Sequence, residues 1–335
     1  MSLMVNPFSP APVGLPAPVD EHAARLRLST YKPQTSGDQT SKILESFLDH
    51  LPYEGKQNII PFITNCDDDN RLFELSEHLQ ATILTKLRVR FTPTITPSPL
   101  PEAEYRTMEV AAHMIARSPR YSQSKLKHDC FKRDNYRCMI TGVYDYRHAP
   151  GNVPDSIIQK TGATDLVHIL PFALGNYQTK IQEQQLARVW ESLNTCFPGI
   201  RSHTNLSADT INDYSNLMTL EASLHTVFGN FEIALDPTSE ENSYRMMIYR
   251  PIPTLLLEIL PQPNENNERI IKFEKHADYE LPNRVLLGTH AAVAKILHAT
   301  GMAETIEKIL RDREELLFLA EDGSTDLKRL LLLAY

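Results

Sequence analysis

The stretch "TDLVHILPF", Thr164–Phe172, has the pattern of a β-strand that ends at a proline and carries one histidine, His168. Its first residues alternate polar with apolar side chains, as half-buried strands do. A buried imidazole costs stability unless its ring nitrogens are hydrogen-bonded or take part in chemistry. His168 is therefore either a core histidine bonded to a neighbour or a functional residue, and the rest of the chain must decide between the two.

A second stretch, "NLMTLEASLH", predicts a short strand followed by a helix. It begins at Asn216 and reaches His225 nine residues later. The chain thus presents a histidine on a strand, then an asparagine, then a histidine on a helix. An asparagine before a strand is often only a turn residue, and a lone histidine on an amphipathic helix is often structural, so both bland interpretations stay open.

Three segments in this order carry a family resemblance: "RDNYRCMITG" (Arg133–Gly142), "HILPF" (His168–Phe172) and "NLMTLEASLHTVF" (Asn216–Phe228). Together they resemble the HNH endonuclease family, over roughly residues 125–250. The C-terminal "LLGTHAAVAKILHATGMAETIEKIL" is similar to the helical tail of fungal members of one branch of that family. The resemblance implies a ββα-metal core, in which a strand histidine and a helix histidine flank a small cleft.

The resemblance also implies roles for these residues. His168 maps onto the general base, which takes a proton from water because a neutral imidazole is available near pH 7. His225 maps onto a metal ligand, and Asn216 either binds the metal or ties the loop that aims the base. Strand alternation places Asp165 two residues before Val167 on the same face, so Asp165 is a further candidate ligand. The expected cofactor is a divalent cation, Mg²⁺ or Mn²⁺, with Zn²⁺ as another option.

The sequence departs from the family in two ways. Where many members place a structural zinc on two cysteine pairs, Cys138 is followed by Thr141, and Glu221 and Leu224 occupy the later positions, so we expect no zinc knuckle. The residue before the strand histidine, often a metal-binding Asp or His in the family, is Val167, which cannot bind a metal.

The segment 117–137 contains seven basic and two acidic residues with tyrosines between them. Such a patch suits phosphate contacts, and its aromatic rings can stack on bases. The alternative is a solvated helix face. The candidate nucleic-acid contacts are Lys125, Lys127, Lys132, Arg133 and Arg137. DNA is the expected partner, and RNA stays open.

Hydrophobic periodicity and proline-rich breaks divide the chain into four predicted parts. These are a Pro-rich flexible arm (1–37), a helical region (38–118), an HNH-like ββα core with an inserted helix (119–255), and a C-terminal strand and helical tail packed on the core (256–335). Strands are expected within Tyr244–Leu260 and Glu268–His276. The predicted fold class is α+β.

Composition excludes several classes of protein. No apolar run approaches the ~20 residues of a membrane span, and the N-terminus lacks the pattern of a secretory signal. The four cysteines, Cys66, Cys130, Cys138 and Cys196, form no CxxC pair and favour a reducing compartment. We therefore expect an intracellular protein, cytoplasmic or nuclear, of unknown oligomeric state. The formal net charge of −8 argues mildly against a surface that binds nucleic acid everywhere.

Three functions remain open at this point. The first is a metal-dependent HNH endonuclease that hydrolyses phosphodiester bonds of DNA with His168 as general base. The second is a degenerate HNH scaffold that binds nucleic acid or protein without cleavage, which Val167 and the net acidity favour. The third is a repurposed enzyme acting on a small molecule, although no Gly-rich phosphate loop, GxSxG turn or dinucleotide fingerprint names a substrate.

Overall fold

The computed structural model describes residues 20–88, 120–148, 160–175, 177 and 179–315. The chain divides into two compact units. The first comprises Met1–Val89, Tyr177–His203 and Ala292–Tyr335, and the second comprises Arg90–Asn176 and Thr204–Ala291. The last part of the helical region expected over 38–118 lies outside the described residues, as does Arg117 of the basic segment.

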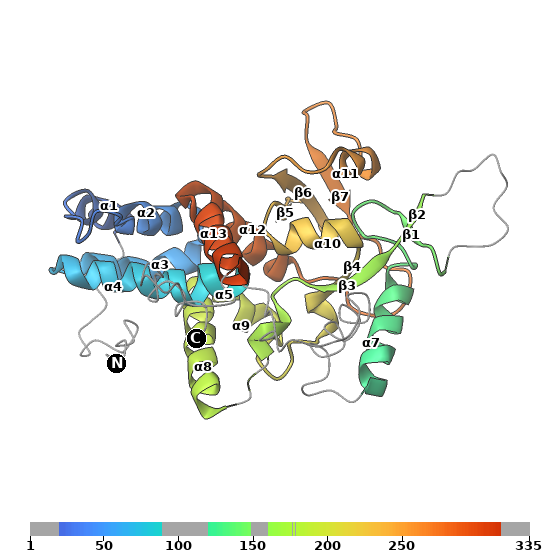
Figure 1. Ribbon diagram of the computed structural model, residues 1–335, viewed down its shortest axis with the longest axis horizontal. Coiled ribbons are helices and arrows are strands. Elements are labelled where there is room, and N and C mark those ends of the chain that lie inside the picture. Colours follow the sequence, from blue (N-terminus) through green and yellow to red (C-terminus); the bar gives the residue numbers. More distant parts are fainter. Residues whose placement is uncertain (1–19, 89–119, 149–159, 176, 178, 316–335) are drawn as a thin grey trace. The chain divides into compact units, whose positions relative to one another are not determined.

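The described part of the first unit is helical (Figure 1). Its elements are α1 (Glu21–Ser29), α2 (Thr40–His50), α3 (Tyr53–Thr64), α4 (Asp69–Leu79), the π-helical turn η1 (Gln80–Thr85), α5 (Lys86–Arg88), α8 (Lys180–Cys196), α9 (Gly199–His203), the part of α12 (Arg284–Thr300) from Ala292 onward, and α13 (Met302–Glu315). α8 is the predicted inserted helix, and Thr179 and Gln182 form a capping box at its start. The sequence predicted no helix within 1–37, where α1 lies.

Apolar faces of α1 to α4 pack against each other, with Leu44, Phe47 and Ile59 fully buried. α3 also packs on α8, and a Cβ at Gly55 would overlap the backbone carbonyl of Cys196. Only glycine allows this approach of two helices. The helical region predicted for the N-terminal third is therefore held together by ordinary apolar burial.

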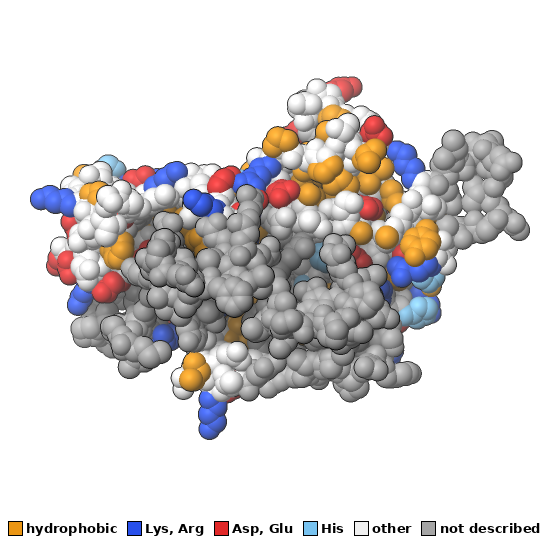
Figure 2. Space-filling view, viewed as in Figure 1, with side chains coloured by type: hydrophobic (Ala, Val, Ile, Leu, Met, Phe, Trp, Pro, Cys, Tyr) orange, Lys and Arg blue, Asp and Glu red, His pale blue; other side chains and the backbone are white. Residues whose placement is uncertain are grey.

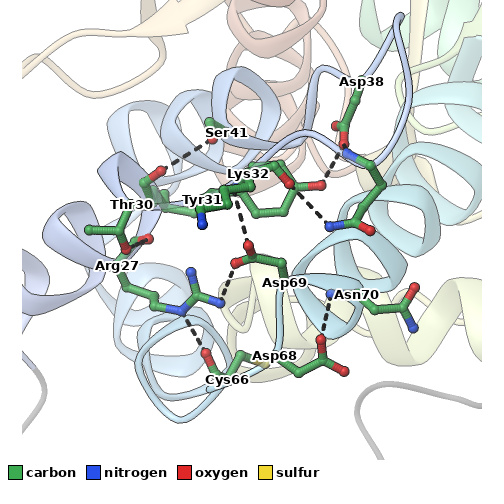
Figure 3. Close-up of polar contacts among 12 residues, drawn as sticks. Arg27, Thr30, Tyr31, Lys32, Asp38, Ser41, Cys66, Asp68, Asp69 and Asn70 are labelled. Carbon is green, nitrogen blue, oxygen red and sulfur yellow. Dashed lines mark hydrogen bonds and ion pairs between the residues drawn. The ribbon is translucent and has the colours of Figure 1, made fainter.

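A polar network ties the start of this unit together (Figure 3). Arg27 on α1 donates from Nε to the Cys66 carbonyl at 2.6 Å and from Nη2 to Oδ1 of Asp69 at 2.7 Å. Oδ2 of Asp69 in turn accepts from the backbone N–H of Lys32 at 3.1 Å. Asp38 accepts the hydroxyl proton of Tyr31. These groups fix the turns between the helices and show no arrangement suited to catalysis.

The second unit contains the predicted ββα core. β3 (Thr164–His168) pairs antiparallel with β4 (Leu217–Glu221), and Thr164 lies opposite Glu221 while His168 lies opposite Leu217. β4 leads directly into α10 (Ala222–Gly229), whose first turn is capped by the Glu221 carboxylate. α10 packs on both strands.

Further elements surround this core. They are α7 (Arg120–Arg133), β1 (Tyr144–Asp145) paired in parallel with β2 (Thr161–Gly162), the 3₁₀ turns η2 (Phe172–Gly175) and η3 (Tyr214–Asn216), α11 (Thr254–Ile259), and the antiparallel sheet of β5 (Ile233–Pro237), β6 (Ser243–Ile248) and β7 (Arg269–Lys272). The α+β fold class and the additional strands are confirmed.

One secondary-structure prediction is wrong. The apolar run after Pro253 forms the helix α11 instead of a strand. β6 ends at Ile248, and Pro253, which lacks a backbone N–H to give to a strand partner, stands at the N-cap directly before the helix. No helix among the described residues is long and apolar enough to cross a membrane.

Candidate active site

His168 is the last residue of β3 and stands between the buried side chains of Val167 and Ile169. Its ring is half-buried, and Nε2 lies 2.9 Å from the amide oxygen Oδ1 of Asn212. Because an amide oxygen only accepts, Nε2 carries the proton and donates. The neutral ring therefore keeps its lone pair on Nδ1, the atom that can accept a proton.

The surroundings of His168 disfavour the imidazolium form. Burial lowers the pKa of His168 to about 4, the hydrogen bond to Asn212 opposes this effect, and the electrostatic interaction with His225 lowers the pKa further. His225 is thus close enough to His168 to influence its charge. At neutral pH the His168 ring is neutral and ready to accept a proton.

Asn216 is fully buried, and its side-chain amide makes three hydrogen bonds to backbone groups. Its Oδ1 accepts from the Leu170 N–H at 2.9 Å, and its Nδ2 donates to the Leu170 and Ile211 carbonyls, each at 3.0 Å. Leu170 follows His168 by two residues, and Ile211 precedes Asn212. Asn216 therefore ties together the loop that carries the base candidate and the loop that carries its hydrogen-bond partner.

This geometry corrects one expectation for Asn216. Both amide protons and the amide oxygen serve buried backbone groups, so the side chain is a positioning device and not a metal ligand. Of the two roles that the sequence left open, tying the loop is the one that the contacts support.

Asp165 and His225 come together as strand alternation and the helical offset predicted. Nδ1 of His225 on α10 lies 3.2 Å from Oδ2 of Asp165 on β3, and the two side chains are 36% and 48% exposed. The hydrogen bond from His225 lowers the pKa of Asp165. The pair is accordingly an ionised carboxylate beside an imidazole, open to solvent.

These two side chains fit a weakly held divalent cation. The 3.2 Å contact between them is a hydrogen bond from Nδ1–H of His225, so an ion held by both side chains through these two atoms would replace that hydrogen bond. Mg²⁺ is commonly bound by one or two carboxylates and completes its shell with water and substrate phosphate, so Asp165 is the ligand of the pair that suits it. Among the described residues no group of three or more His, Cys, Asp or Glu side chains is arranged to hold a metal. A zinc site with three protein ligands is therefore not formed there.

The residues at which this chain departs from the family pattern have other structural roles. The Val167 side chain is buried in the core. Cys138 is also buried, and its sulfur accepts from the Thr141 N–H at 3.4 Å. Glu221 caps α10 through the N–H groups of Ser223 and Leu224.

The expectation for Arg133 is wrong. Its side chain is fully buried, and all five guanidinium donors are used within the protein. Two donate to the Asp134 carboxylate, at 2.6 and 3.0 Å, and the others donate to the carbonyls of Tyr214, Leu217 and Glu280. Asp134 also accepts from the Thr219 N–H, at 3.0 Å, on β4. Arg133 thus anchors α7 to the core and offers nothing to a phosphate.

The other predicted basic contacts remain near the surface. Lys125 and Lys132 are exposed on α7, and Lys127 is half-buried with its ammonium 5.4 Å from the Phe131 ring centroid. The guanidinium of Arg137 lies 3.7 Å from the Tyr144 ring centroid and donates to the Tyr144 hydroxyl. Lys127 is also close enough to Asp165 to lower its pKa.

Sequence reasoning missed two residues of this site. Asn212 orients His168, and Arg147 lies close enough to Asp165 to help lower its pKa. Asn212 precedes Asn216 by four residues in "NDYSN", but only the folded loop brings it to the histidine. Arg147 lies ten residues after Arg137, the last residue of the basic segment 117–137, so the charge pattern did not include it.

Comparison with known protein families gives one match. Residues 138–236 match a family model described as HNH endonuclease. The matched segment contains His168, Asn216, His225 and Asp165. It does not distinguish the fungal branch. Neither the curated proteins nor the solved structures searched include a match to this chain.

Proposed function

Because residues 138–236 carry the HNH endonuclease match, we propose that this protein is a metal-dependent nuclease that hydrolyses phosphodiester bonds of DNA, with His168 as general base. The family match supports a nuclease function in general. The observation that carries the finer proposal is the state of His168, whose Nε2–H is bound by Asn212 and whose Nδ1 is left to accept a proton.

The chemistry follows from that tautomer. A water placed at Nδ1 of His168 would lose its proton to the ring as its oxygen attacks phosphorus and the bond from phosphorus to one sugar oxygen breaks; the departing oxygen takes a proton from solvent. The ring then becomes positively charged, and the hydrogen bond from Nε2–H to Asn212 strengthens because a charged donor binds more tightly. A bound phosphodiester would bring negative charge to this cation and raise the pKa of His168 from its low value.

Charges around the site suit a phosphodiester. Lys127 and Arg147 are both close enough to Asp165 to act on its carboxylate, and either can balance charge on a nearby phosphate. A divalent cation held by Asp165 and His225 would polarise a phosphoryl oxygen and stabilise the departing oxygen. Asn216 contributes only position, because it holds both loops that define the base.

A second function, nucleic-acid binding without cleavage, is favoured by one observation. Val167 stands where the family often has a ligand, and the described residues supply only the pair Asp165 and His225 to a cation. A protein that only binds nucleic acid would use the basic surface of α7 but would not need His168 to be oriented as a base.

Plasmid nicking with purified full-length protein separates the two functions. We expect nicking in Mg²⁺ or Mn²⁺ that falls at least a hundredfold in His168→Ala, in line with the usual contribution of a general base. His276→Ala, which removes an exposed histidine of the same unit, is the matched control and should nick like the wild type. Equal nicking by His168→Ala and wild type defeats the assignment of the base. Salt-dependent DNA binding without cleavage in either metal selects the scaffold.

Other features of the proposal rest on the sequence alone. RNA is the alternative substrate. RNA transcribed from the plasmid, incubated with the protein under the same conditions and analysed for cleavage on a gel, decides between the two polymers. An intracellular location, cytoplasmic or nuclear, stays a prediction.

A further inference from the structure

Three consecutive side chains project from the end of β1 in the second unit. Tyr146 is 61% exposed, and the side chains of Arg147 and His148 are 47% and 41% exposed. Hydrophobic, basic and histidine side chains gather in this part of the space-filling view (Figure 2), where Figure 1 draws β1 and β2. An exposed tyrosine, arginine and histidine in succession do not contribute to a core.

A buried carboxylate holds two of these side chains in place. Asp145 accepts from Nε of Arg147 at 3.1 Å and from Nη2 at 2.9 Å, and it lies 3.0 Å from Nδ1 of His148. It also accepts from the Thr164 hydroxyl at 2.8 Å. Burial opposes its ionisation, but these hydrogen bonds outweigh burial and hold the pKa of Asp145 below its usual value. Arg147 and His148 are therefore held in place before a ligand binds, and this arrangement requires the charged carboxylate of Asp145 to be buried.

Aromatic rings continue the surface toward α7. The His148 ring stacks on Tyr136 with centroids 4.6 Å apart and planes inclined by 21°, and Phe131 meets both rings edge-on. The guanidinium of Arg147 lies 5.4 Å from the Tyr146 ring centroid. Phe131 itself is buried and supports the rings of Tyr136 and His148 from below. We call Lys127, Tyr136, Tyr146, Arg147 and His148 the aromatic–basic strip.

The strip reaches the candidate active site. Two basic residues of the strip, Lys127 and Arg147, are close enough to Asp165 to help lower its pKa. Nη2 of Arg147 also lies 3.5 Å from the carbonyl of Thr164, the residue before Asp165 on β3. A polymer with a phosphate near Asp165 and His225 would therefore have its neighbouring nucleotides within reach of the strip.

Resting on the proposed nuclease function, we propose that the aromatic–basic strip binds unpaired nucleotides next to the cleavage site, so that the substrate is single-stranded or locally unpaired nucleic acid. The faces of unpaired bases stack on aromatic rings, while cations between the rings contact the backbone phosphates. In a duplex the base faces are covered by neighbouring pairs, so the exposed Tyr146 ring has no face to stack on. The strip thus selects strand state and not sequence.

Binding without cleavage tests this inference. The full-length chain is titrated in EDTA against fluorescent 12-mers of deoxythymidine, of uridine and of a DNA duplex, and anisotropy is read. Single strands should bind more tightly than the duplex. Tyr146→Ala should weaken single-strand binding by roughly five- to a hundredfold, the usual range for loss of one stacked base. Tyr146→Phe keeps the ring and should stay within about twofold of wild type.

Tyr53→Ala is the matched control, because Tyr53 is a 75% exposed tyrosine of the first unit. It should bind single strands like the wild type. Unchanged single-strand binding in Tyr146→Ala, equal losses for single strand and duplex, or no single-strand binding by the wild type would each overturn the inference. A preference for the deoxythymidine or the uridine strand identifies the polymer, and either supports the strip.

The two proposals fail independently. If wild type nicks plasmid through His168 but binds single strands without help from Tyr146, only the strip is wrong. If single strands bind through Tyr146 but no metal supports cleavage, the strip stands as a binding surface and the nuclease proposal falls.

Discussion

Replacing Asn216 with alanine should destabilise the second unit strongly, because the side chain holds buried backbone groups and not a metal. The change removes the hydrogen-bond partner of three buried backbone groups, the Leu170 N–H, the Leu170 carbonyl and the Ile211 carbonyl. An unsatisfied buried group costs about 1–3 kcal/mol. Water that enters the vacated space recovers part of this, so we expect a loss of about 3–5 kcal/mol in the free energy of unfolding. That is a large share of the ~5–15 kcal/mol that stabilises a typical domain.

Urea unfolding followed by far-UV circular dichroism measures this loss. The only tryptophan, Trp190, belongs to the first unit, so its fluorescence would not report the change. Hydrogen exchange at the Leu170 amide gives a local readout and should accelerate in the variant. Asn266→Ala, an exposed asparagine of the same unit, is the matched control and should stay within about 0.5 kcal/mol of wild type.

Two outcomes would refute the reasoning. A loss below about 1 kcal/mol with unchanged exchange at Leu170 would mean that the three hydrogen bonds carry no weight. A loss that appears only when Mg²⁺ or Mn²⁺ is present would instead indicate that Asn216 acts through a bound cation.

Three further predictions concern buried ionisable groups. His168 should protonate near pH 4, so its base function should persist well below pH 6.5. The measurement is an NMR titration of its ring signals, which are assigned by their loss in His168→Gln. Protonation near pH 6.5 would contradict the effect of burial. Arg133→Met should cost about 3–5 kcal/mol in urea unfolding because it leaves the Asp134 carboxylate buried without its partner, and a cost near zero would contradict the buried pair. His290 is stacked between Phe228 and Phe231, and burial lowers its pKa to about 3. As pH falls below about 6.5, this imidazole takes up a proton only in the unfolded state. Between pH 7 and pH 5 the free energy of unfolding should therefore fall by about 2 kcal/mol more in wild type than in His290→Leu. Equal pH dependence of the free energy of unfolding in the two proteins would refute this.

Local patterns predicted the part of the site that depends on short-range order. The alternation in β3 placed Asp165 on the face that α10 covers, and the step from Asn216 to His225 predicted a strand followed by a helix. The pair Asp165 and His225 follows from these two periodicities once the hairpin closes. The family resemblance over the same residues is confirmed by the match to residues 138–236.

What the sequence did not reveal depends on contacts between distant residues. Arg133 resembles its basic neighbours in the chain, but helical geometry turns it toward the core, where the Tyr214 and Glu280 carbonyls happen to lie. Asn212 reaches His168 only because two loops, held by Asn216, meet. Charge runs and spacing describe one segment at a time, so they cannot show which member of a basic run is buried.

The acidity of the whole chain is a poor guide to the surface that a nucleic acid would meet. Around α7 and β1 the carboxylates point inward. Asp129, Asp134 and Asp145 are at most 5% exposed and are bound to tyrosines, to arginines or to a histidine. Lys125 and Lys132 point outward on α7. Since the Debye length is about 8 Å at physiological ionic strength, acidic residues elsewhere are largely screened from this surface. The sign of the charge met by a phosphate is therefore decided by which residues each element exposes, and here a chain with a net charge of −8 presents cations.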